Sequence, residues 1–388
     1  MPDAVIRDFT SIEGGYGKRR MGLIMRGITL GSAVAAMLCF TSVGQAGPSL
    51  LLDLDNGKVL AHEDAFAPWY PASLTKLMTA YVTYRSIAAG EVTMKSPVRI
   101  SQRAAKEPPS RMGFKPGSVL TVDNAIKILM VKSANDVSAA LAESIAGSSK
   151  AFVERMNAEA RRLGMNGTRF VNAHGLHADE QVTNARDLAV LAMALRNEFP
   201  QYNKYYELEA IVVDNKTIDN TNELIRRFDS ANGMTTGYTG PSGFNLMATA
   251  TRNGRNLLAV VIGEPTVEAR GDKTANLLAQ GFATSATEAL YIGQLRPNGF
   301  EPTQAVNLRS TICTEAHWKA VTEARAPSGK PAFKSPHLQA PMRKPVALTV
   351  ALGGATGPES KAPRYADVPI PTPRPTDYVP VAASAQGG

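Results

Sequence analysis

Pro71-Ala72-Ser73-Leu74-Thr75-Lys76 opens an apolar stretch near the start of the chain. Residues three apart lie on one face of a helix, so the Lys76 amine can approach the Ser73 hydroxyl. A serine hydroxyl is a weak nucleophile until a neighbouring base takes its proton, and a lysine in a water-poor cleft can serve as that base. The spacing therefore predicts an activated serine at Ser73. The alternative is an ordinary helix start with a solvated lysine one turn in.

Length and composition predict a soluble globular protein. The chain has 388 residues, of which 44% are hydrophobic and 20% charged, so it can bury a large core and hold two domains. Its two cysteines, Cys39 and Cys313, are far apart and show neither a disulfide framework nor metal-ligand spacing. No metal and no cofactor is indicated.

The first 46 residues have the pattern of a secretory signal peptide. A basic segment, Lys18–Arg20, precedes an apolar run from Ile28 to Val43, and Gly44-Gln45-Ala46 provides a small-residue cleavage site. A transmembrane helix is the competing interpretation, but the run is short and rich in small residues. We therefore expect export to the periplasm. The net charge of +8 favours anionic cell-wall or membrane surfaces, whereas nucleic acid is not expected because no basic run is interleaved with aromatic residues.

Residues 47–290 have the pattern of one α/β domain. Two Asn-Gly turns, at Asn56 and Asn253, each separate a pair of apolar strand-like runs. Helical patterns are expected over 125–131, 137–145, 152–163 and 188–195, with a loop-like segment over 167–187. The expected strands are 49–54, 58–60, 211–213, 233–238, 244–251 and 257–263, and a closing helix is expected over 273–282.

Residues 291–388 differ in composition from the domain. Fourteen of the 25 prolines lie between Pro297 and Pro380. Such a segment cannot form a continuous helix or sheet core, so we expect a proline-rich, largely disordered tail. Strand character at Ala305–Leu308 and Val346–Leu352 leaves open a small β segment within 296–350. No amphipathic stretch is present in this tail, so a C-terminal membrane anchor is not expected.

Three short motifs follow one another along the domain: Ser73-x-x-Lys76, Ser133-x-Asn135 and Thr235-Thr236-Gly237. Their order and approximate spacing resemble the active-site signatures of penicillin-recognising serine enzymes. The flanking residues are more specific and resemble the D-alanyl-D-alanine carboxypeptidases, the low-molecular-mass penicillin-binding proteins, over residues 48–290. The segments that carry this resemblance are Tyr70–Thr79, Ser133–Asp136, Asn172–Leu176, Thr236–Thr239 and Gly243–Leu246.

The resemblance implies an α/β fold of the β-lactamase/transpeptidase-like class, in which helices flank a five-stranded antiparallel sheet. It also implies a role for each motif residue. Ser73 would attack the carbonyl between the two D-alanines of a peptidoglycan stem peptide, and Lys76 would be its base. Ser133 would relay a proton to the leaving amine, and Asn135 would hold Lys76 and the substrate backbone. The backbone N–H groups of Ser73 and Tyr238 would bind the oxyanion, and β-lactam antibiotics would acylate the same serine.

The third motif departs from the family pattern. The family has Lys-Thr-Gly here, whereas this chain has Thr235-Thr236-Gly237 as its substrate-binding strand. A threonine donates one hydrogen bond but carries no charge, and charge-assisted hydrogen bonds are roughly twice as strong as neutral ones. We expect weaker binding of a free C-terminal carboxylate unless another cation substitutes, and the resemblance makes Arg270 the candidate.

Two alternative functions stay open on sequence alone. A class A β-lactamase shares the implied fold and needs a glutamate-bearing loop, for which Glu180 and Asn184 have a compatible spacing. A catalytically weak homologue that binds cell-wall peptide would be consistent with Thr235. We expect His174, in the loop that resembles the border of the family's active site, to have a capping or packing role.

Overall fold

The computed structural model describes residues 47–284, 289–297, 299, 303–325, 328–341 and 343–361. The predicted signal peptide and the last part of the predicted tail, residues 362–388, lie outside these ranges. All of the described residues belong to one compact unit of the chain.

The central element is a five-stranded antiparallel sheet with the order β2-β1-β9-β8-β7. This confirms the sheet expected from the resemblance, and the two Asn-Gly turns connect β1 to β2 and β8 to β9. Strand β7 is an edge strand of the sheet, so one side of its backbone is not paired within it. The strand bounds are β1 Ser49–Asp53, β2 Lys58–Glu63, β7 Ala231–Thr239, β8 Gly243–Arg252 and β9 Arg255–Glu264.

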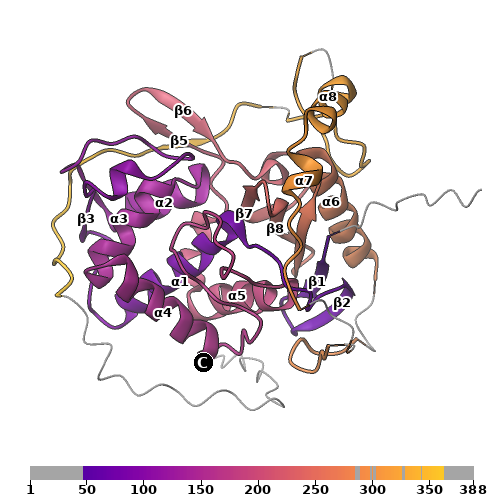
Figure 1. Ribbon diagram of the computed structural model, residues 1–388, viewed down its shortest axis with the longest axis horizontal. Coiled ribbons are helices and arrows are strands. Elements are labelled where there is room, and N and C mark those ends of the chain that lie inside the picture. The colour runs from indigo at the N-terminus through magenta and orange to yellow at the C-terminus, as the bar shows by residue number, and fades with distance from the viewer. Residues whose placement is uncertain are drawn as a thin grey trace, which may run out of the picture. The chain divides into compact units, whose positions relative to one another are not determined.

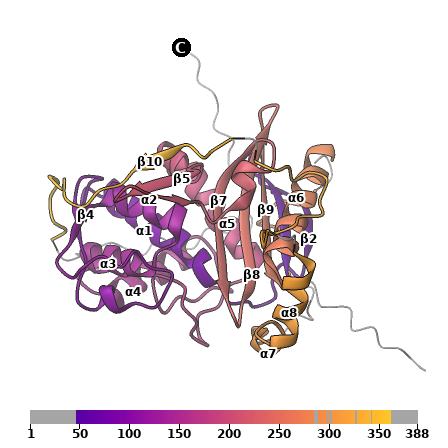
Figure 2. The ribbon, with the colours of Figure 1, turned by 90° about the horizontal axis from the view of Figure 1, so that it is seen from above.

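Apolar residues cover both faces of this sheet because successive side chains of a strand point to opposite sides. Leu50 and Leu52 of β1 join the larger core, with helices α1 and α5, whereas Leu51 joins a smaller core with Leu278 of helix α6. Helices therefore cover both faces (Figures 1 and 2). These helices are α1 Thr75–Ala88, α5 Ala185–Glu198 and α6 Val267–Ala283.

Three further helices pack with α1 beside the sheet, and Figure 1 shows them gathered on the side away from α6. They are α2 Val122–Lys132, α3 Asn135–Ala146 and α4 Ser149–Arg162. Each of α2 and α4 begins at a residue whose hydroxyl accepts a backbone N–H, Thr121 and Ser148 respectively. Two short strands, β3 Pro97–Arg99 and β4 Val119–Thr121, pair beside them and were not predicted from the sequence.

The chain after the sheet runs over the surface of this unit. Helices α7 Arg309–Ile312 and α8 Glu315–Ala324 lie beside the β7–β8 connection, where the Leu308 N–H donates to the Pro241 carbonyl at 2.9 Å. Strand β10 Ala347–Thr349 pairs in parallel with β5 Ala210–Val213, which also pairs with β6 Lys216–Asp219. The strand-like run Ala305–Leu308 has no strand in the described part of the chain. Within the described residues, no helix has both the length and the apolar character needed to cross a membrane.

Candidate active site

Ser73 lies in a single 3₁₀ turn, η1 Ala72–Leu74, directly before α1. Its neighbour Ala72 has a φ of 46°, so the chain turns sharply before the helix begins. Gly175 lies against this turn: a Cβ added to Gly175 would lie 1.9 Å from the Ala72 carbonyl oxygen. The loop that carries Gly175 therefore supports the backbone of Ser73 through a contact that only glycine permits.

The Lys76 amine is held by three acceptors. It donates to Ser73 Oγ at 3.0 Å, to Asn135 Oδ1 at 2.8 Å and to the His174 carbonyl oxygen at 2.6 Å. The ammonium or amine nitrogen is thus fixed beside the Ser73 hydroxyl, as the sequence spacing predicted. The side chain has no exposed surface.

Burial acts strongly on the protonation of this amine. Removal from water lowers the pKa of Lys76 from 10.5 to about 7, although the nearby Asp136 carboxylate acts in the opposite direction. A substantial share of the side chain is therefore an uncharged amine near neutral pH, which is the form that can accept a proton from Ser73.

The second motif lies at the junction of α2 and α3. Ser133 adopts a left-handed conformation, φ 57° and ψ 41°, which ends α2 and lets α3 begin two residues later at Asn135. Asn135 Nδ2 donates to the Pro108 carbonyl at 2.9 Å, so the amide oxygen is oriented toward Lys76. Ser133 Oγ is buried and makes no hydrogen bond within the described part of the chain, so its hydroxyl remains available to another group.

The third motif lies on the edge strand β7 beside Ser73. A Cβ added to Gly237 would lie 3.0 Å from the Ser73 backbone nitrogen, so glycine lets this strand approach the 3₁₀ turn closely. The Thr235 side chain is 1% exposed, and Thr236 Oγ1 donates to Thr221 Oγ1 at 2.9 Å. Tyr238 is 40% exposed, and its ring stacks on Phe244 with ring centroids 4.2 Å apart.

Arg270 lies next to this strand but is already paired. Its Nη2 donates to both carboxylate oxygens of Glu223, at 2.9 and 3.0 Å, and Nη1 donates to the Asn245 carbonyl at 3.3 Å. Glu223 could not be predicted as a partner of Arg270 from the sequence, because 47 residues separate them. The structure thus brings Arg270 to the third motif with its charge compensated.

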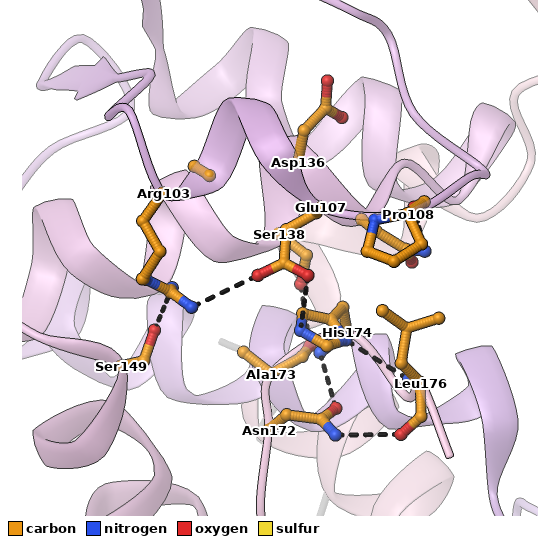
Figure 3. Close-up of polar contacts among 12 residues, drawn as sticks. Arg103, Glu107, Pro108, Asp136, Ser138, Ser149, Asn172, Ala173, His174 and Leu176 are labelled. Carbon is orange, nitrogen blue, oxygen red and sulfur yellow. Dashed lines mark hydrogen bonds and ion pairs between the residues drawn. The ribbon is translucent and has the colours of Figure 1, made fainter. Parts of the chain in front are cut away.

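Figure 3 shows how the His174 ring is held. Its Nε2 lies 3.4 Å from Glu107 Oε2, and its Nδ1 accepts the Leu176 N–H at 3.2 Å. Burial lowers the pKa of His174, while the hydrogen bond to Glu107 acts against that shift. Arg103 donates to the other oxygen of Glu107 at 3.2 Å. The neutral ring and Glu107 therefore hold the loop whose carbonyl oxygen accepts from Lys76.

The structure shows where the glutamate and the asparagine considered for a β-lactamase loop lie. Asn184 Oδ1 accepts the Asp187 N–H at 2.8 Å and caps α5, and the Glu180 side chain is exposed. Across the part of the chain that the structure describes, no group of three or more His, Cys, Asp or Glu side chains could hold a metal ion.

Comparison with known proteins places this geometry in a family. The family profile described as D-alanyl-D-alanine carboxypeptidase matches residues 41–266. The chain belongs to the D-alanyl-D-alanine carboxypeptidase family. It is 32% identical over 300 residues to the D-alanyl-D-alanine carboxypeptidase DacC of Escherichia coli, covering 73% of this chain and 74% of that one. It is 33% identical over 251 residues to DacF of Bacillus subtilis, covering 64% of each chain.

Solved structures of the family have the same fold. Penicillin binding protein 6B from Escherichia coli has 36% sequence identity and a TM-score of 0.59, over 61% of this chain and 77% of that chain. Penicillin-Binding Protein D2 from Listeria monocytogenes, solved in its cefotaxime-bound form, has 26% identity and a TM-score of 0.56, over 61% and 97%. The chain thus spans a little under two thirds of the length of the curated DacF.

Proposed function

We propose that this family member is a serine-type D-alanyl-D-alanine carboxypeptidase that removes the terminal D-alanine from peptidoglycan stem peptides. Ser73 Oγ attacks the carbonyl carbon between the two D-alanines while Lys76 takes its proton. The proton passes through Ser133 to the leaving D-alanine amine. Water then attacks the carbonyl carbon of the Ser73 ester. One proton of the water passes through Lys76 to Ser73 Oγ, and the shortened peptide leaves as a carboxylic acid.

The observation that carries this proposal is the position of Lys76. A fully buried amine with a pKa near 7, 3.0 Å from Ser73 Oγ, is the arrangement that activates a serine for acyl transfer. The oxyanion of the tetrahedral intermediate would lie between the N–H groups of Ser73 and Tyr238, since Gly237 brings the two backbones together. The loss of one such donor costs about 3 kcal/mol in the transition state.

A labelled penicillin tests whether Ser73 is acylated. The label should attach to the wild-type chain at the peptide that contains Ser73, and the Ser73→Ala variant should take up none. Acylation of a residue other than Ser73 would contradict the assigned nucleophile. Slow release of the label is expected, whereas rapid turnover of many penicillin molecules would instead favour a β-lactamase.

A second candidate function rests on Thr235. Without the motif lysine, the chain could bind cell-wall peptide with little turnover. The complete set of Ser73, Lys76, Ser133 and Asn135, with Lys76 in contact with two of the others, supports the enzyme over a pure binder. The predicted signal peptide supports a periplasmic location, where the proposed substrate lies.

A further inference from the structure

The pair formed by Glu223 and Arg270 lies at the third motif. Glu223 is the first residue of the 3₁₀ turn η4 Glu223–Arg226, which contacts β7. The guanidinium of Arg270 reaches the Asn245 carbonyl, and Asn245 is the β8 residue paired with Gly237 of β7. The two charges are therefore beside the strand that is expected to bind the substrate.

The same region is connected to Thr236. Thr221, two residues before Glu223, accepts the Thr236 hydroxyl at 2.9 Å. Thr236 is paired with Leu246 of β8, and Leu246 packs in the smaller core with helix α6, which carries Arg270. The Glu223–Arg270 pair thus lies on the side of β7 to which Thr236 points.

The two charges of this pair compensate one another. The Nη2 of Arg270 donates to both oxygens of the Glu223 carboxylate, and the two side chains are 5% and 23% exposed. Thr235, whose side chain points to the other face of β7, adds no charge. Hydrogen bonds between an arginine and a carboxylate are charge-assisted and roughly twice as strong as neutral ones. An incoming carboxylate would therefore have to compete with Glu223 for the guanidinium.

We infer that Glu223 is a specificity-determining residue that makes the subsite for the substrate's C-terminal group neutral. The site then takes peptides that end in a neutral group, such as a C-terminal amide, about as well as peptides that end in a free carboxylate. This inference rests on the proposed function and goes beyond it, because it names the chemical class of C-terminal group that the site accepts.

The test compares one acylated tripeptide ending in D-Ala-D-Ala with its C-terminal amide. The measured quantity is the ratio of kcat/KM for the acid to kcat/KM for the amide. In wild type, we expect a ratio within about threefold of one. Glu223→Gln leaves Arg270 with an uncompensated charge. The ratio should rise about tenfold through a lower KM for the acid, since the guanidinium can then make charge-assisted hydrogen bonds to the substrate carboxylate. The matched control is Glu209→Gln, which neutralises another carboxylate that is paired with an arginine, Arg343, and should leave the ratio unchanged.

Two further variants keep the test decisive if Glu223→Gln does not fold. Arg270→Gln leaves the Glu223 charge alone, and the ratio should fall below that of wild type. The double variant Glu223→Gln/Arg270→Gln is neutral again, and its ratio should return to the wild-type value.

Several results would overturn the inference. These are a wild-type ratio of tens or more, an unchanged ratio in both single variants, or a rise in Glu223→Gln that persists in the double variant. A wild-type chain that labels Ser73 with penicillin and shows one of these results disproves the inference alone. A chain that neither labels Ser73 nor hydrolyses either peptide disproves the proposed function, and the inference with it.

Discussion

The side chain of Lys76 and the backbone carbonyl of His174 meet at 2.6 Å, across 98 residues of sequence. This contact joins helix α1 to the loop 172–176, which also lies against the turn of Ser73 through Gly175. A single loop thus positions both the proposed base and the proposed nucleophile. The acylation chemistry should therefore be sensitive to changes in that loop as well as in the motifs.

The first prediction concerns the pH dependence of acylation. Because burial lowers the pKa of Lys76 to about 7, its free amine forms as pH rises through that value. The rate of penicillin acylation should increase with pH and level off, with its midpoint near pH 7 in the wild-type chain. Stopped-flow or quenched labelling measures this, and a rate that is flat between about pH 5 and 9 would exclude Lys76 as the base.

The same shift makes a prediction for stability. Unfolded Lys76 holds its proton up to about 10.5, whereas the folded chain loses it at about 7. The unfolded state binds more protons between these values, so the contribution of Lys76 to the free energy of unfolding should rise with pH across that window. Urea titrations of wild type and Lys76→Met should show a difference that changes in this direction, and an opposite slope would contradict the buried, neutral amine.

A Gly175→Ala substitution should disturb Ser73 from a distance. The new Cβ would clash with the Ala72 carbonyl, and Gly175 has a φ of +88°, which alanine adopts poorly. We expect a loss of about 2–4 kcal/mol of stability and a large loss of acylation. Gly164→Ala is the matched control, since its φ is +72° but nothing lies within 4 Å of its added Cβ. An equal loss of acylation in both variants would mean that backbone strain alone explains the effect, and it would contradict a role for the contact between Gly175 and Ala72.

Glu107 should act as a positioning residue through His174. Glu107→Ala removes the acceptor of the His174 Nε2–H. We expect the acylation rate to fall about tenfold, because the free energy of one hydrogen bond to a charged group is then lost from the loop that holds Lys76. Glu107→Gln keeps an acceptor in place and should retain most of the rate. Thermal unfolding reports any loss of fold. Equal rates in wild type and Glu107→Ala would show that the ring contact does not position Lys76.

The sequence predicted the parts of this molecule that depend on local pattern. The Asn-Gly turns at Asn56 and Asn253, the strand over 233–238 and the approach of Lys76 to Ser73 all follow from spacing and turn chemistry, and the structure confirms them. Helix α6 begins at Val267, six residues before the expected 273, because the Thr266 hydroxyl caps it. The apolar pattern alone indicates 273 because it does not register a capping hydroxyl.

Contacts between distant residues could not be predicted in this way. Nothing in the spacing of Gly175 and Ala72 or of Glu223 and Arg270 indicates that they touch, since both contacts arise from how loops pack on the sheet. Strands β3 and β4 were missed because each has three residues, too few for an alternating pattern to be recognised. The roles of the site residues stay predictions that the experiments above address.

Replacing Thr235 by lysine tests the charge at the third motif. A lysine would add a cation where the subsite now has a buried neutral hydroxyl, so acylation by carboxylate-bearing penicillins should become about tenfold faster. Thr235→Gln, of similar length but uncharged, is the control and should not reproduce the gain. A wild-type chain that takes up no label while Thr235→Lys does would favour the binding homologue over the active enzyme.

The most direct measurement of the central claim is product analysis on a pentapeptide that ends in D-Ala-D-Ala. The account predicts that the wild-type chain releases one D-alanine per peptide and leaves the tetrapeptide. It also predicts that Ser73→Ala, in which the acceptor of the 3.0 Å contact from Lys76 is gone, releases none. Release of D-alanine that persists in Ser73→Ala would contradict the account.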